Sequence, residues 1–143
     1  MIRATAAPRL PGLLPLAAFV ALSLVMAGAV VHAASKAAPI RPSFNAYFPS
    51  DFTDAAYQKD AVSRVSKQWA VRGGLPARGS KTVIASTIAR DGSLVATVVT
   101  MKSGSKEWDD AALAAVKKAA PFTGLPSGYP QSKIEVHWHF SAN

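Results

Sequence analysis

The chain has 143 residues and contains no cysteine. Disulfides, thiolate metal sites and cysteine nucleophiles are therefore excluded, and packing has to stabilise the fold. Histidine is also scarce, with three residues, and acidic residues number eight against sixteen basic ones. The resulting net charge of +8 suits acidic partners, anionic lipid headgroups or simple solubility, and charge alone does not choose among them.

Charge is missing altogether from Pro11 to Val31, and Arg3 and Arg9 precede this run. A basic start, an apolar stretch and small residues up to Ala33 are typical of a secretory signal, so residues 1–33 are predicted to be a cleaved signal peptide. The alternative is an uncleaved membrane anchor, because a run of about 20 residues is long enough to cross a bilayer as a helix. In both cases the remainder is exported to the periplasm. We therefore expect no nucleic-acid partner, and membrane contact only if the segment is retained.

Residues 34–52 are predicted to be a tether. The prolines at 39 and 42 favour extended backbone, and no helical or strand period is sustained. The tether is nevertheless rich in aromatic residues, which either pack on the flank of the following domain or recruit a partner. These residues are Phe44, Tyr47, Phe48 and Phe52.

Residues 53–143 predict a single domain that begins with a helix over 54–69. Thr53 is expected to cap this helix, and the charged side chains lie on one side of it. Apolar side chains recur every four residues on the other side, which indicates a buried face. They are Tyr57, Ala61, Val65 and Trp69.

A hairpin and a second helix follow. Two runs rich in β-branched residues, 81–90 and 93–101, flank Asp91-Gly92, a pair typical of hairpin turns. The second helix is expected over 106–120, with Ser105 as its cap, acidic residues near its start and lysines near its end. One face consists of small residues that suit close packing on a sheet: Ala112, Ala115, Val116 and Ala119.

The last run, Lys133 to Phe140, alternates strictly between apolar and polar residues and predicts a half-buried strand. The element order is then α-β-β-α-β. A right-handed crossover places the last strand beside the first, which gives an α+β fold with a three-stranded antiparallel sheet of order 2-1-3 packed on two helices. The outer edge of the last strand is free in this arrangement. Its polar side chains are Lys133, Glu135, His137 and His139.

Catalytic or metal chemistry has little support in the sequence. His137 and His139 point the same way on a strand, as some zinc ligands do, but Glu135 is the sole nearby carboxylate on that face. Asp109 and Asp110 are adjacent on a helix, so their side chains diverge and do not form a catalytic pair. No nucleophile motif or phosphate-binding loop is complete. We expect no enzyme activity and no cofactor, and we keep a metal-binding protein using His137 and His139 as an alternative.

Several short motifs follow one another in a specific order and spacing: Asp91-Gly92, Ser103-Gly104, the Trp108–Leu113 block, Pro121-Phe122 and Leu125-Pro126-Ser127-Gly128. With them, the stretch from Tyr57 to Phe140 resembles the C-terminal domain shared by the TonB and TolA cell-envelope proteins. The resemblance implies that Ile84 and Ile88 face the core. Trp108 and Lys102 depart from it, because the family often has leucine and serine there.

The resemblance implies a periplasmic interaction module that binds an extended segment of an envelope protein, either an outer-membrane receptor or a periplasmic protein. Binding would use β-augmentation at the free edge from Lys133 to Phe140, with Glu135, His137 and His139 supplying selectivity. Self-pairing through the same edge is another expectation.

An inner-membrane-anchored energy transducer is the alternative within this class. The long spacer of TonB and TolA is missing, however, and the nineteen residues from Ala34 to Phe52 extend at most ~65 Å at ~3.4 Å each. So short a tether favours the interaction module.

Overall fold

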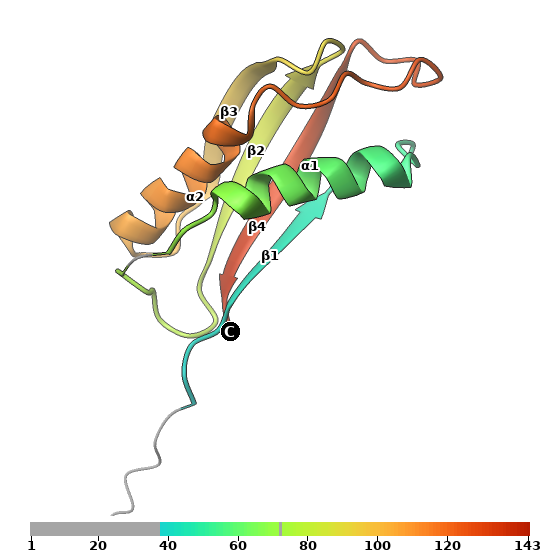
Figure 1. Cartoon of the computed structure of the whole chain (residues 1–143). Helices are drawn as coiled ribbons and strands as arrows, with labels where there is room; N and C mark the ends of the chain where they lie inside the picture. The colour runs from blue at the N-terminus through green and yellow to red at the C-terminus, as the bar shows by residue number, and fades with distance from the viewer. Residues whose placement is uncertain (1–37, 72) are drawn as a thin grey trace, which may run out of the picture. The chain divides into compact units, whose positions relative to one another are not determined.

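The computed structural model describes residues 38–71 and 73–143. The expected signal peptide, residues 1–33, lies outside the described residues, so its cleavage stays a prediction. Six elements follow one another in the described part (Figure 1). They are β1 (Pro42–Tyr47), α1 (Ala55–Gln68), β2 (Lys81–Ala89), β3 (Leu94–Met101), α2 (Lys106–Ala119) and β4 (Lys133–Ala142).

The strands form one antiparallel sheet with the order β1-β4-β2-β3. The predicted order 2-1-3 is right for the hairpin and the last strand, because β4 and β3 lie on opposite sides of β2. The prediction of three strands is wrong: β1, inside the segment predicted to be a tether, adds a fourth strand beside β4. The segment has only six residues and begins with a proline, so its alternation is too short to predict a strand. Its partner, β4, lies at the other end of the domain sequence, so no local signal indicates the pairing.

Helices α1 and α2 cover one face of the sheet (Figure 1). The predicted apolar faces of both helices are buried, except that Trp69 follows α1 as its C-cap and is half-buried. The buried small residues let α2 approach the sheet closely, as expected. The faces consist of Tyr57, Ala61 and Val65 in α1 and of Ala112, Ala115, Val116 and Ala119 in α2.

The two helices begin at side-chain caps. The predicted cap of α1 is wrong by one residue, because the Tyr57 amide donates to Asp54 Oδ1 at 2.8 Å, and Thr53 lies one position earlier. The cap of α2 is confirmed: the Trp108 amide donates to Ser105 Oγ at 3.3 Å. In both cases an oxygen satisfies a first-turn N–H that has no partner within the helix.

The core between the helices and the sheet is built around aromatic residues. Trp108 and Trp138 are fully buried, as predicted, and so are Ile84 and Ile88. The Trp138 indole Nε1 donates to Ser86 Oγ at 2.6 Å, which satisfies a polar atom inside the core. Ser86 on β2 and Trp138 on β4 thus join neighbouring strands from the helix-covered side.

Gly92 explains why the hairpin turn and the Pro121-Phe122 motif occur together. Its φ is +87°, and a Cβ atom built there would lie 1.9 Å from the Phe122 carbonyl oxygen. The Phe122 amide donates to the Gly92 carbonyl at 2.8 Å. A side chain at position 92 would therefore be strained and would push the post-helix loop away from the hairpin.

Polar contacts fix the two ends of α2. At its start, the carboxylate of Asp109 accepts hydrogen bonds from Thr82 Oγ1 and, at 3.0 and 2.8 Å, from Ser103 N and Oγ. Burial alone would raise the pKa of Asp109, but the bonds from Thr82 and Ser103 outweigh it and lower that pKa below its ordinary value. Asp110 turns outward and pairs with Lys106, so the two adjacent carboxylates diverge as predicted.

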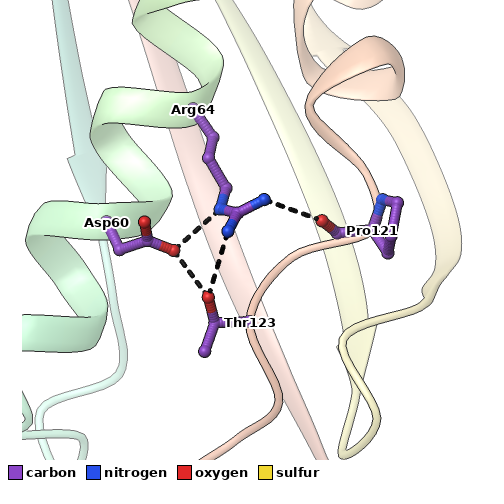
Figure 2. A network of polar contacts seen from close by, with 4 residues as sticks. All are labelled: Asp60, Arg64, Pro121 and Thr123. Atoms are coloured by element: carbon purple, nitrogen blue, oxygen red, sulfur yellow. Dashed lines mark hydrogen bonds and ion pairs between the residues drawn. The ribbon is translucent and has the colours of Figure 1, made fainter.

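Beyond the end of α2, a small network joins the loop to α1 (Figure 2). The Arg64 guanidinium donates to Asp60 Oδ2 at 2.8 Å and to the Pro121 carbonyl at 3.2 Å, and Thr123 Oγ1 donates to Asp60 Oδ2 at 2.7 Å. The bond from Thr123, followed by that from Arg64, lowers the pKa of Asp60. Because the side chains are about two-fifths exposed, this network orients the loop more than it stabilises the fold.

Candidate functional site

The predicted site residues lie together on β4. Lys133 and Glu135 are exposed and His137 and His139 are half-buried, all on the face of the sheet away from the helices. The alternate residues point into the core and are buried: Ile134, Val136, Trp138 and Phe140. The strict alternation in the sequence therefore assigned both faces of this strand correctly.

Part of the outer edge of β4 is covered by another strand. This corrects the sequence-based expectation that the edge is free from Lys133 to Phe140. β1 pairs with it from Pro42, opposite Ala142, to Tyr47, opposite His137. Beyond the strand, Arg41 and Asn143 exchange backbone hydrogen bonds of 2.6 and 3.0 Å. This pairing ends at His137, and Lys133 to Val136 lie beyond it.

Aromatic side chains hold β1 in place. Phe44 is stacked on Trp138, with ring centroids 6.0 Å apart, and lies 4.9 Å from Phe140. Phe48, just after β1, lies 5.8 Å from Phe52 and 6.2 Å from Trp138. The tether aromatics thus pack on the domain, as one of the two sequence-based interpretations expected. They cover the very edge that was predicted to be open.

On the face of β4 away from the helices, each histidine makes one side-chain contact, His137 with a carboxylate and His139 with an aromatic ring. His137 Nε2 lies 2.7 Å from Glu135 Oε1, and the ring of His139 lies 4.5 Å from that of Tyr47 on β1. Burial, reinforced by the nearby Lys81 and His137, lowers the pKa of His139. His139 is therefore uncharged at neutral pH, and its ring lies against Tyr47 of β1.

The two histidines have no further ligand set around them in the described part of the chain. Residues 38–71 and 73–143 contain no group of three or more His, Asp or Glu residues placed to hold a metal ion. Glu135 bonds His137, while His139 faces Tyr47. The outer edge of β4 is paired with β1 from His137 to Ala142, and the pairing does not extend to Lys133–Val136.

The outer edge of β4 pairs with an extended segment of the chain itself, β1. β1 demonstrates the chemistry: its main chain adds to the sheet, its alternate side chains enter the aromatic cluster, and Tyr47 rests on the outer face. A family model described as "TonB C terminal" matches residues 54–140. The chain belongs to the TonB C-terminal family.

Domains of the TonB C-terminal family are protein-interaction modules of the cell envelope and contact partners such as outer-membrane receptors. The comparisons with curated proteins and with solved structures found no match. β1, at residues 42–47, lies outside the matched range. The strand that covers the β4 edge is therefore an addition to the part of the chain that the family model describes.

Neither helix in the described ranges, 38–71 and 73–143, is long and apolar enough to cross a membrane. Sequence reasoning missed β1 as a strand. The sequence carries only a short alternation there, Ser43-Phe44-Asn45-Ala46-Tyr47, in which Phe44 and Ala46 are the inward residues, and it is too short to predict a strand by itself.

Proposed function

We propose that the protein is a periplasmic interaction module that binds an extended segment of another cell-envelope protein at the outer edge of β4. The partner segment adds as an antiparallel strand, and its main-chain N–H and C=O groups bond to those of β4. The observation that carries the proposal is β1, because a segment outside the matched family range already occupies this edge in the same manner. The partner therefore takes the place of β1.

The side chains of β4 differ in when an incoming partner can reach them. Lys133 and Glu135 lie beyond the end of β1, so an incoming segment meets them before any exchange. His137 and His139 lie where β1 is paired, and a partner reaches them only after Tyr47 has moved. Lys133 is basic and Glu135 is acidic. They favour a partner segment that carries one acidic and one basic side chain next to the part that pairs with β4 in place of β1.

The aromatic contacts of β1 indicate which side chains a partner needs in order to replace it. Removing Phe44 and Phe48 from Trp138 would return apolar surface to water at a cost of about 1.5–3 kcal/mol for each fully buried ring, and less here because both are half-buried. A partner recovers this free energy only with aromatic or large aliphatic residues spaced four apart along its strand, as Phe44 and Phe48 are. We therefore propose an aromatic-rich extended segment.

An anchored energy transducer receives less support. With β1 paired, only residues 34–41 separate the end of the predicted signal from the sheet, a reach of about 27 Å at ~3.4 Å each. Release of β1 and the following loop would restore about 65 Å. The metal-binding alternative has no specific observation in its favour.

A peptide exchange experiment tests the proposal. The probe is a synthetic peptide with the sequence of residues 39–49, and the protein is the chain with residues 38–49 deleted, so that both Phe44 and Phe48 come only from the peptide. We expect the deletion variant to bind the peptide at least tenfold more tightly than the wild type does, because in the wild type β1 competes at a millimolar effective concentration. Fluorescence anisotropy of the labelled peptide measures both affinities.

Two controls sharpen the result. A peptide with Phe44→Ala and Phe48→Ala should bind weakly, and a double variant, Asn45→Cys with His139→Cys, should lock β1 when oxidised because these residues are paired in register. Oxidation should abolish peptide binding and reduction should restore it. If the deletion variant is unfolded alone, the peptide should restore its cooperative melting. A folded deletion variant that ignores the peptide, or an unfolded one that the peptide does not rescue, contradicts the proposal.

A further inference from the structure

One face of the sheet carries no helix in the described part of the chain. Both helices lie on the other face (Figure 1), and the pairing register shows which side chains point away from them. Two neighbouring rows of these side chains cross all four strands, and together we call them the open-face patch. The first row is Asn45, His139, Val83 and Met101, and the second is Tyr47, His137, Ala85 and Val98.

The large apolar side chains of the open-face patch are exposed, whereas a sheet face in water normally carries polar side chains. Val98 is 59% exposed, Tyr47 55% and Met101 47%. Met101 lies opposite Val83, Val83 lies opposite His139, and the ring of His139 lies 4.5 Å from that of Tyr47. The exposed residues therefore belong to one surface that runs from β3 to β1. A continuous surface of this kind indicates a contact site, which scattered apolar residues do not.

The charged side chains beside the open-face patch are basic at one end of the sheet. Arg41 and Lys81 are exposed and point to the open face, because each is paired with a residue of β4 that does so. Neither forms an ion pair with another described residue. From this end to Tyr47 the described part of the face carries no acidic side chain. Glu135 lies beyond the patch and bonds His137.

The chain enters the domain at this basic end. Arg41 immediately precedes β1, so the predicted signal peptide or anchor, residues 1–33, connects to the domain beside Arg41 and Lys81. If that segment is retained in the membrane, residues 34–41 reach at most about 27 Å at ~3.4 Å each. The basic end of the patch would then stay close to the bilayer.

We propose that the open-face patch docks on a phospholipid bilayer that carries anionic headgroups. Val98 and Met101 enter the interfacial region, and Tyr47 lies at the level of the headgroups, where aromatic residues with a polar end are favoured. Arg41 and Lys81 contact the lipid phosphates. Each basic side chain near an anionic surface strengthens binding about fivefold. Because the patch has only two such residues and few large apolar ones, the docking is peripheral and reversible.

A bilayer matches the open-face patch better than an acidic polypeptide does. An extended segment covers little more than the width of one strand, whereas the apolar and basic side chains of the patch are spread over all four strands. A lipid surface contacts such a spread of side chains at once, and it requires no complementary side-chain pattern.

The docking is independent of the proposed function. The partner segment pairs with the edge of β4, whereas Val98 and Met101 lie on β3, at the other side of the sheet. Val98→Ser with Met101→Ser should abolish docking on vesicles and leave the peptide exchange at β4 unchanged. Both side chains are exposed, so the melting temperature of this double variant should stay within a few degrees of the wild type. Failure of one test therefore leaves the other proposal intact.

A fluorescent label tests the docking directly, because the chain has no cysteine of its own. Val98→Cys in the exported protein is labelled with an environment-sensitive dye and mixed with vesicles of equal parts phosphatidylglycerol and phosphatidylcholine. If the N-terminal segment is retained, the protein is reconstituted into these vesicles. We expect the emission to shift to the blue with this composition and not with phosphatidylcholine alone. Lys117→Cys, exposed on α2, is the matched control and should not respond.

Charge variants provide the second measurement. Arg41→Gln with Lys81→Gln should weaken the docking about 25-fold, because two favourable charges are lost. Lys117→Gln with Lys118→Gln removes the same charge from α2 and should change the docking less than about twofold.

Two kinds of result overturn the inference. One is an emission that stays unchanged up to about 5 mM anionic lipid, or that shifts equally for the label on α2. The other is a shift that soluble polyglutamate, or concentration of the protein without lipid, produces in place of vesicles. It would assign the open-face patch to an acidic polypeptide or to a second copy of the chain.

Discussion

Trp138 is the largest fully buried side chain of β4. It is fully buried, contacts Phe44, Phe48 and Phe122, and donates its indole N–H to Ser86. We expect Trp138→Ala to lower the free energy of unfolding by about 3–5 kcal/mol, because it removes a large buried ring and leaves a cavity. Urea denaturation followed by far-UV circular dichroism measures the loss.

Trp138→Phe and Ser86→Ala separate the ring from its hydrogen bond. Each should cost less than Trp138→Ala, because the phenyl ring keeps part of the packing and Ser86→Ala removes only the acceptor of the indole N–H. A Trp138→Ala protein that melts within a few degrees of the wild type would show that this side chain does not hold β1, β2 and β4 to the helices.

At the scale of elements, β1 is a strand whose stability depends on a few anchors. Phe44 enters the aromatic cluster of Trp69, Trp138 and Phe140, while Tyr47 is 55% exposed. We expect Phe44→Ala to destabilise the domain by about 2 kcal/mol, since the ring is half-buried, and to raise hydrogen exchange at the amides that join β1 to β4.

Tyr47→Ala is the comparison variant, because it removes an aromatic ring from the same strand but from the outer face. It should change stability by less than about 1 kcal/mol and leave exchange in the rest of β1 slow. Equal exchange in the two variants would show that the anchors of β1 are its backbone bonds alone, and it would weaken the requirement for aromatic residues in a partner.

For the molecule as a whole, the distance between membrane and sheet depends on whether the N-terminal segment is removed. We predict export followed by cleavage after Ala33, because small residues end an uncharged run that follows Arg3 and Arg9. N-terminal sequencing of the protein from a periplasmic fraction measures this. A protein that retains Arg3 in the membrane fraction would reverse the prediction, and release of β1 would then more than double the length of its tether.

The sequence by itself determined the elements whose periodicity is long or whose caps are local. The alternation of Lys133 to Phe140 placed both faces of β4, and the spacing of Ala112, Ala115, Val116 and Ala119 placed the buried face of α2. Only the tertiary structure decided that residues 42–47 form a strand, because a six-residue segment has no stable pairing of its own and depends on β4 and Trp138 for its hydrogen bonds and its aromatic contacts. β1 takes the place of β4 at one edge of the sheet. The site residues could therefore be predicted from the sequence, while the strand that pairs with them could not.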